Sequence, residues 1–196
     1  TEFKILQLLA SKPGRVFIRY PGPSCRSVTG RSPPRTISKG ARKICIVLTE
    51  STQQVSQVVK FAHANRIPLI ARGTGTNLSG GSVASQGGIS LVLTKMNKLL
   101  DLDIENQRVV VQPGIITLDL KNELAKHGYL YQPDPASEKM TTIGGNFGEN
   151  AGGTHCLKYG VTLDHALRAS VVLSDGEVVT LDRGTGGSDD GTTGGY

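Results

Sequence analysis

Two glycine-rich segments hold the residues of this sequence that could do chemistry. The first, ARGTGTNLSGG, covers residues 71–81 and contains four glycines. Because glycine permits positive φ and close backbone approach, successive N–H groups there can form a nest for an anion. We expect a phosphate or pyrophosphate at this loop, and a tight surface turn that binds nothing is the alternative that the glycines alone leave open. The polar side chains that could add donors are those of Thr74, Thr76, Asn77 and Ser79.

The two common nucleotide motifs do not describe this loop. A Walker A sequence needs a second glycine five residues after the first, followed by lysine. Counting from Gly73, that position is Leu78, and the loop contains no lysine. The Rossmann fingerprint needs a third glycine where Leu78 again stands, although Gly73 and Gly75 satisfy its start. The loop is therefore neither a P-loop nor a Rossmann turn.

The second segment, residues 133–162, is polar and also rich in glycine. Two Gly-Gly pairs flank residues 146–151, a spacing that a simple linker does not explain. Ile143, Phe147 and Ala151 recur every four residues, which predicts a short helix whose glycines and amino end face a ligand. Two separate sets of backbone donors imply one long anionic ligand, and a dinucleotide fits that description better than a sugar phosphate.

The elements that must position the first loop form a strand-helix-strand unit. Residues 44–48 and 67–70 are short apolar runs typical of buried parallel strands. Between them, Ser51 and Gln54 have capping-box spacing and precede apolar residues at helical spacing. We expect a right-handed crossover, with the glycine loop at the carboxyl end of the second strand, where open α/β sheets bind ligands.

The remaining elements are further strands and one more amphipathic helix. Apolar alternation predicts a strand pair and a hairpin, the latter around an Asp-Gly turn. Leu120 and Leu124 predict the inward face of a helix that Gly128 closes. This mixture of elements indicates an α/β (α+β) fold. We place strands at 89–93, 100–104, 109–111, 166–173 and 177–181, and the helix at 117–128.

The formal charge of +6 does not indicate a nucleic-acid binder. Residues 11–43 carry nine of the 22 Lys and Arg residues and no acidic residue. The rest of the chain has 13 basic and 16 acidic residues, which is a formal net charge of −3. The basic segment also contains five prolines and is not patterned as the folded basic face that nucleic acid requires. We interpret residues 1–43 as an irregular basic arm, with a targeting peptide as the alternative.

Composition limits the other classes of protein and site. Three cysteines without CxxC spacing indicate reduced thiols in a cytoplasmic setting rather than disulfides or a zinc site. No stretch is long and apolar enough to span a membrane. Residues 184–196 contain six glycines and no apolar run, so we expect a glycine-rich tail that ends inside a loop.

A family resemblance joins these segments. It rests on RGTGTNLSGG, on PDPASEKMTTIGGNFGENAGGTHCLKYGVT and on VVLSDGEVV. These motifs resemble the PCMH-type FAD-binding domain of the FAD-linked oxidases, most closely the glycolate oxidase FAD subunit and D-lactate dehydrogenase group. The resemblance covers residues 44–183 and implies two α/β subdomains that hold FAD between them. The implied pyrophosphate loop consists of Arg72, Gly73, Thr74, Gly75, Thr76, Asn77, Leu78, Ser79 and Gly80. The other implied FAD contacts are Pro133, Asp134, Pro135, Thr142, Ile143, Gly144, Gly145, Asn146, Asn150, Gly152, Gly153, Tyr159, Gly160, Val161 and Thr162.

The resemblance also implies an activity, which is oxidation of glycolate or D-lactate by hydride transfer to FAD. The family's catalytic and metal-site residues lie in a C-terminal cap region that residues 1–196 do not include, so we expect no catalytic residue and no metal ligand here. An iron-sulfur or second flavin subunit is left open as a partner, as is peripheral association with a membrane. A noncatalytic flavin- or nucleotide-binding module is the alternative function.

The ionisable residues near the two segments have simple interpretations. Arg72 could bind the phosphates or serve as a salt-bridged structural arginine. The first loop offers no His or Cys for covalent attachment of flavin, so FAD should be held noncovalently. His155 and Cys156 lie beside the second segment, where we favour structural contacts over a catalytic base or a covalent link.

Overall fold

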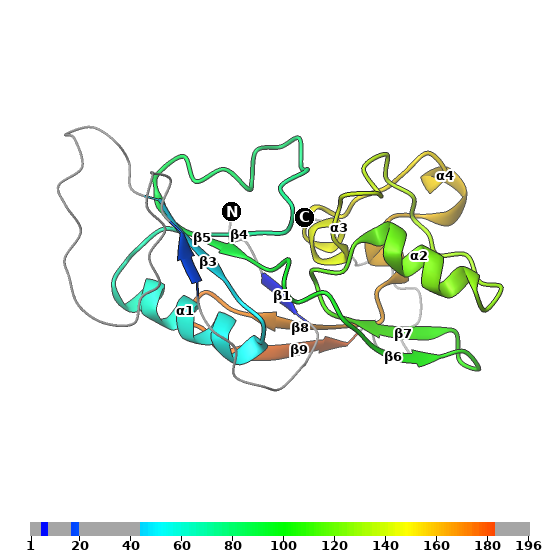
Figure 1. The fold of residues 1–196 in the computed structure, drawn as a ribbon, viewed down its shortest axis with the longest axis horizontal. Helices are drawn as coiled ribbons and strands as arrows, with labels where there is room; N and C mark the ends of the chain where they lie inside the picture. Colours follow the sequence, from blue (N-terminus) through cyan, green and yellow to red (C-terminus); the bar gives the residue numbers. More distant parts are fainter. Residues whose placement is uncertain (1–4, 8–16, 20–43, 183–196) are drawn as a thin grey trace, which may run out of the picture.

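The computed structural model describes residues 5–7, 17–19 and 44–182, which form three small sheets with helical segments around them (Figure 1). Most of the predicted basic arm and the whole predicted tail at residues 184–196 lie outside the described residues. The two glycine-rich segments lie entirely within them, so their surroundings can be followed residue by residue.

The sheet that carries the first glycine loop has four strands in the order β2-β3-β5-β4. Strands β3, β5 and β4 run parallel, whereas β2 is antiparallel to β3. Strand β5 therefore lies between the two strands that α1 (Thr52–Ala64) connects. Because β4 ends at Arg72, the glycine loop leaves its carboxyl end, as predicted. The strands are β2 (Phe17–Arg19), β3 (Ile44–Leu48), β4 (Leu69–Arg72) and β5 (Gly88–Val92).

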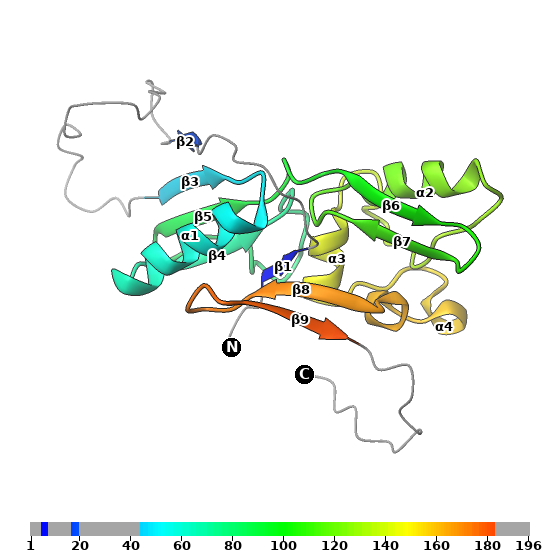
Figure 2. The ribbon, with the colours of Figure 1, turned by 90° about the horizontal axis from the view of Figure 1, so that it is seen from below.

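Helix α1 covers one face of this sheet (Figure 2). Val55, Val59 and Ala62 are buried in one cluster with Leu91 of β5 and Val47 of β3. The Ser51 side chain caps the helix by accepting a hydrogen bond from the Gln54 N–H at 3.4 Å. The Gln54 side chain accepts from the N–H of Glu50, the residue before the cap, at 2.9 Å, so the first bond of the predicted capping box forms and the second is displaced by one residue.

A two-stranded antiparallel ribbon and one helix form the second unit. The ribbon consists of β6 (Leu99–Asp103) and β7 (Arg108–Val111). Helix α2 (Thr117–Ala125) packs Leu120 and Leu124 against Val111 of the ribbon. The strand pair and the inward face of the helix follow the predicted pattern, and Gly128 has the positive φ (+79°) expected just beyond a helix end.

The third sheet, β1-β8-β9, supports the second glycine-rich segment (Figures 1 and 2). Its strands β1 (Ile5–Gln7), β8 (Arg168–Val172) and β9 (Val178–Asp182) are antiparallel. Helix α3 (Ile143–Glu149) packs Phe147 against Ala169 and Val171 of β8. The chain reaches β8 from α3 through α4 (Cys156–Tyr159) and the 3₁₀ helix η1 (Thr162–His165).

Two short strands lie in the segment that we expected to be irregular. Strand β1 pairs with β8 and strand β2 with β3, both through three residues. A three-residue strand is too short to show an alternating pattern, and it adds to a sheet edge through backbone hydrogen bonds that any sequence can make. The expectation that ordered elements begin near Ile44 therefore fails at these two places.

The described helices are short. Within residues 5–7, 17–19 and 44–182, none is both long and apolar enough to cross a membrane.

Candidate functional site

The first glycine loop is anchored at its start by Arg72. The Arg72 guanidinium turns back on the loop and donates from Nη2 to the carbonyl of Thr74 at 2.9 Å and from Nε to the carbonyl of Gly73 at 3.3 Å. Arg72 makes no ion pair with the described carboxylates. Of the two interpretations of this arginine, the salt-bridged one does not apply, and its observed contacts fix the backbone of the loop.

The loop leaves its backbone donors free. Among the described residues, no N–H group from Gly73 to Ser82 donates a hydrogen bond to a protein acceptor. Gly75 and Gly80 have φ values of +84° and +79°, so the chain turns sharply at two points within this run. Consecutive N–H groups on such turns form a concave surface for an anion. The predicted pyrophosphate loop therefore has the donors that a phosphate requires.

The second segment lies against the first. A Cβ added at Gly73 would stand 2.1 Å from Oγ1 of Thr142, the residue that caps α3. Thr74 Oγ1 also donates to the carbonyl of Met140 at 2.7 Å. The two segments, separated by about fifty residues in the sequence, are thus packed directly against each other. Only glycine at position 73 permits an approach this close.

The amino end of α3 does not offer the free donors that we expected there. The N–H of Ile143 donates to the Ile115 carbonyl at 3.0 Å, and that of Gly144 donates to the Pro113 carbonyl at 2.8 Å. The N–H of Gly145 donates to Oγ1 of Thr142 at 3.2 Å. These bonds tie α3 to the turn before α2 and use the donors that a ligand would need.

Free donors appear instead just beyond α3. Within the described part of the chain, the N–H groups of Gly152, Gly153 and Thr154 make no hydrogen bond to a protein acceptor. A Cβ at Gly153 would lie 2.4 Å from the backbone oxygen of Asp134, so glycine permits this turn to pack on residues 133–135. The second donor set predicted from the sequence therefore exists, at the second Gly-Gly pair rather than at the helix.

Asn146 is part of the protein core and not of an exposed surface. Its side chain is 3% exposed, and it donates to Thr117 Oγ1 and accepts from Thr141 Oγ1, both at 2.8 Å. Thr142 is similarly buried, at 2%. The side chain of Asn146 thus joins α2 to α3, and that of Thr142 accepts the capping hydrogen bond of α3. Any contact of theirs with a ligand would need a rearrangement of that network.

Asp134 and His155 form a hydrogen-bonded pair beside the free donors of the second turn. Asp134 Oδ2 lies 2.5 Å from Nδ1 of His155, and Thr154 Oγ1 donates to the same oxygen at 3.2 Å. Desolvation acts to raise the pKa of Asp134, but the hydrogen bonds from His155 and Thr154 outweigh it and hold that pKa below its ordinary value. His155 therefore has the structural contact that we favoured, and its partner is a side chain.

The Asp134 pair predicts an acid dependence of stability. Because the folded-state pKa of Asp134 is lowered, its contribution to stability is complete above about pH 4 and is lost as the pH falls through the lowered value. D134N should reduce the drop in urea midpoint between pH 6 and pH 3. D119N, which removes an exposed carboxylate with no partner among the described residues, should leave the drop unchanged. An equal drop in wild type and D134N would contradict the assignment.

The end of the second segment folds back on α3. Asn150 ends the helix with φ +48° and accepts a hydrogen bond from the N–H of Leu163 at 3.0 Å. Thr162 Oγ1 donates to the carbonyl of Ala151 at 2.7 Å, and Gly160 turns with φ +80°. Tyr159, Gly160 and Val161 are at least partly exposed, whereas Thr162 is buried. Tyr159 to Val161 are accessible to a ligand, and Thr162 serves the turn.

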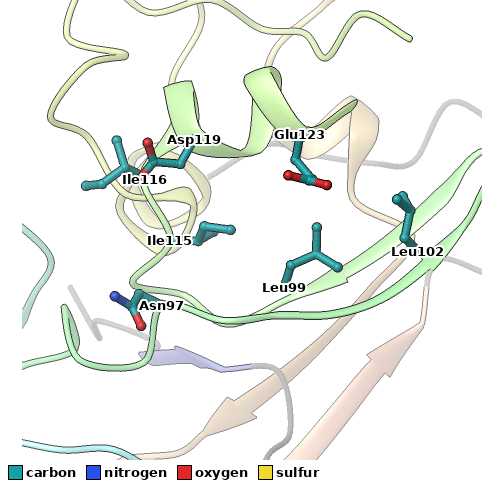
Figure 3. A pocket seen from close by; sticks show the side chains of 7 residues that line it. All are labelled: Asn97, Leu99, Leu102, Ile115, Ile116, Asp119 and Glu123. Carbon is teal, nitrogen blue, oxygen red and sulfur yellow. The ribbon is translucent and has the colours of Figure 1, made fainter. Parts of the chain in front are cut away.

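A cavity of about 380 Å³ lies away from both segments, between α2 and the β6–β7 ribbon (Figure 3). None of its lining residues belongs to the predicted FAD contacts. Its walls combine Leu and Ile side chains with Asn97, and the carboxylates of Asp119 and Glu123 stand on the α2 side. Two carboxylates disfavour a phosphate, so this cavity is not a candidate for the anionic ligand. It is lined by Asn97, Leu99, Leu102, Ile115, Ile116, Asp119 and Glu123.

Comparison with known families identifies the fold that carries this site. The family described as "FAD binding domain" matches residues 44–182, which include both glycine-rich segments. The chain belongs to this FAD-binding family. The glycolate oxidase subunit GlcD of Bacillus subtilis is 42% identical over 134 residues, covering 68% of this chain and 28% of that protein. A D-lactate dehydrogenase of Anaerostipes hadrus is 45% identical over 141 residues, covering 72% of this chain and 30% of that protein.

The FAD-binding fold is also found in solved structures. The 6-hydroxy-D-nicotine oxidase from Arthrobacter nicotinovorans superposes with a TM-score of 0.62 at 29% identity, covering 70% of this chain and 30% of that one. The predicted fold class, an α/β (α+β) PCMH-type FAD-binding domain, is confirmed. The predicted relationship to glycolate oxidase and D-lactate dehydrogenase is also confirmed. The chain spans less than a third of the length of these relatives.

Proposed function

We propose that residues 44–183 hold FAD noncovalently as part of a flavoprotein dehydrogenase that oxidises a 2-hydroxy acid such as glycolate or D-lactate. In this proposal the pyrophosphate lies on the loop from Arg72 to Gly80. The rest of the cofactor follows residues 133–135, the Gly152–Gly153 turn and Tyr159–Val161. FAD, when bound, supplies the hydride acceptor for the substrate's α-carbon. The side chains described here would bind and orient the cofactor, and no catalytic residue is assigned among them.

One observation carries the proposal, which is the uninterrupted run of free N–H groups from Gly73 to Ser82. The residues of this loop range from half-buried to exposed, so its unused donors are accessible to an external acceptor. Pyrophosphate oxygens are acceptors of suitable charge, and FAD carries them. The free donors of Gly152 to Thr154 supply a second set of contacts on the same surface.

Noncovalent attachment is favoured by the residues at hand. Residues 73–82 contain no His or Cys that could form a bond to the flavin. At the second segment, Nδ1 of His155 is engaged by Asp134 and is therefore not available for a bond to the flavin. Release of free flavin on denaturation of the purified protein would support noncovalent binding, whereas flavin that stays with the precipitated chain would refute it.

The setting of this domain follows from its relatives. Because one relative is a glycolate oxidase subunit, we propose that the electrons pass to a partner subunit with an iron-sulfur cluster or a second flavin. We propose a cytoplasmic location, with peripheral association at a membrane open to test by fractionation. The alternative is a flavin-binding module without turnover.

The decisive experiment measures flavin and its reduction separately. The purified chain should show the yellow absorbance of bound FAD. Anaerobic addition of glycolate or D-lactate should bleach that absorbance if the chain oxidises the substrate. Bound flavin without bleaching would select the noncatalytic alternative. Absence of flavin after reconstitution with excess FAD would refute the proposal itself.

A further inference from the structure

Glu149, at the end of α3, contacts the glycine loop, although sequence reasoning did not include it among the site residues. Its Oε1 accepts a hydrogen bond from Asn77 Nδ2 at 3.2 Å, and its Oε2 accepts from Ser79 Oγ at 3.0 Å. Asn77 in turn accepts from Ser82 Oγ at 2.6 Å. A single carboxylate thus connects the far half of the loop to the helix.

The loop depends on such side-chain contacts because its own backbone donors are free. At its start, Arg72 holds the carbonyls of Gly73 and Thr74, as described above. From Asn77 to Ser82, the contacts that reach another element are those with Glu149, within the described part of the chain. A loop ordered before binding loses less conformational entropy when a ligand arrives.

We propose that Glu149 is a positioning residue that holds the glycine loop in its ligand-binding shape through Asn77 and Ser79. The inference deepens the proposed function, since the ligand in question is the FAD pyrophosphate. Glu149 does not contact the phosphates in this scheme. It holds the side chains of Asn77 and Ser79, which lie within the run of free N–H groups.

A carboxylate near a pyrophosphate also repels it. The relative sizes of this repulsion and of the positioning effect therefore decide whether loss of Glu149 weakens or strengthens FAD binding. Glu149 is exposed to solvent, where water and salt reduce the repulsion of charges several ångströms apart to about a twofold change in affinity. Loss of hydrogen bonds to a charged acceptor, with the order that they impose, is expected to change affinity about tenfold. Positioning should therefore outweigh repulsion.

The test compares FAD affinity and loop order in three variants of this chain. E149A should raise the FAD Kd about tenfold, because it removes the acceptor. E149Q should raise it no more than about threefold, because its amide oxygen can still accept from Asn77 or Ser79. E105A, which removes an exposed glutamate from the β6–β7 turn, is the matched control and should leave the Kd unchanged.

Nitrogen-15 relaxation of the FAD-free protein supplies the second measurement. The order parameters of Gly80 and Gly81 should fall in E149A, recover in E149Q and remain at the wild-type value in E105A. Tighter FAD binding by both E149A and E149Q would overturn the proposal, because repulsion would then dominate. Unchanged order parameters in E149A would overturn it too. If wild type binds no FAD, the proposed function fails, and the order parameters alone decide the role of Glu149.

Discussion

G75V should abolish retention of FAD, with an expected loss of about 100-fold in affinity. Gly75 has φ +84°, a conformation that costs a β-branched residue about 1–3 kcal/mol. The added Cβ would also stand 2.8 Å from Nη2 of Arg72, whose hydrogen bond to Thr74 shapes the loop. Together these effects approach about 3 kcal/mol, or two orders of magnitude in Kd. Titration of flavin fluorescence measures the change.

The matched control is G148A in α3. A Cβ there meets no heavy atom within 4 Å, so FAD binding should not change, and the helix should gain up to about 1 kcal/mol. Circular dichroism should show the same secondary structure in wild type, G75V and G148A. If G75V retains wild-type affinity, the pyrophosphate is bound elsewhere.

N146A should destabilise the protein by about 3 kcal/mol. The substitution removes the acceptor of the buried Thr141 Oγ1 and the donor to Thr117 Oγ1, which keeps only its 3.3 Å bond to the Thr141 carbonyl. It also removes the side-chain link between α2 and α3. Equilibrium unfolding in urea measures the loss, which should appear as a lower midpoint with little change in slope.

N106A is the control for this second prediction. Asn106 bonds Asp103 at 2.7 Å in an exposed turn, so its loss should cost less than about 1 kcal/mol. The predicted role of Asn146 as an FAD contact gives a different outcome. Wild-type unfolding together with weak FAD binding in N146A would show that Asn146 acts on the ligand.

The parts of the fold that were predictable are those that local sequence determines. The apolar run at β3, the cap at Ser51 and the inward residues of α2 each specify one element through its own residues. The place of β5 between β3 and β4 could not be predicted, because strand order depends on which edges pair and not on any one strand. The three-residue strands β1 and β2 carry too little pattern to be detected.

The same distinction between local sequence and tertiary packing applies to the candidate site. The first loop was predictable because a glycine run follows directly on an apolar strand. The second donor set was misplaced at the amino end of α3, because the carbonyls of Pro113 and Ile115 that occupy those donors lie about thirty residues earlier in the sequence. The sequence motif assigned Asn146 to the ligand. Its burial results from packing against α2, which the motif does not show. Glu149 could have been suggested only as a carboxylate within the second segment.

The connection from β4 to β5 has a consequence for how this architecture can diversify. These strands are parallel neighbours, and such a pair is usually joined by a crossover helix. Residues 73–87 make the crossover without one, and the N–H groups of residues 73–82 are not consumed by hydrogen bonds among the described residues. Few hydrogen bonds join the backbone of residues 73–82 to the sheet. Replacing residues 73–82 with a loop that fits another anion would therefore remove few hydrogen bonds from the surrounding strands.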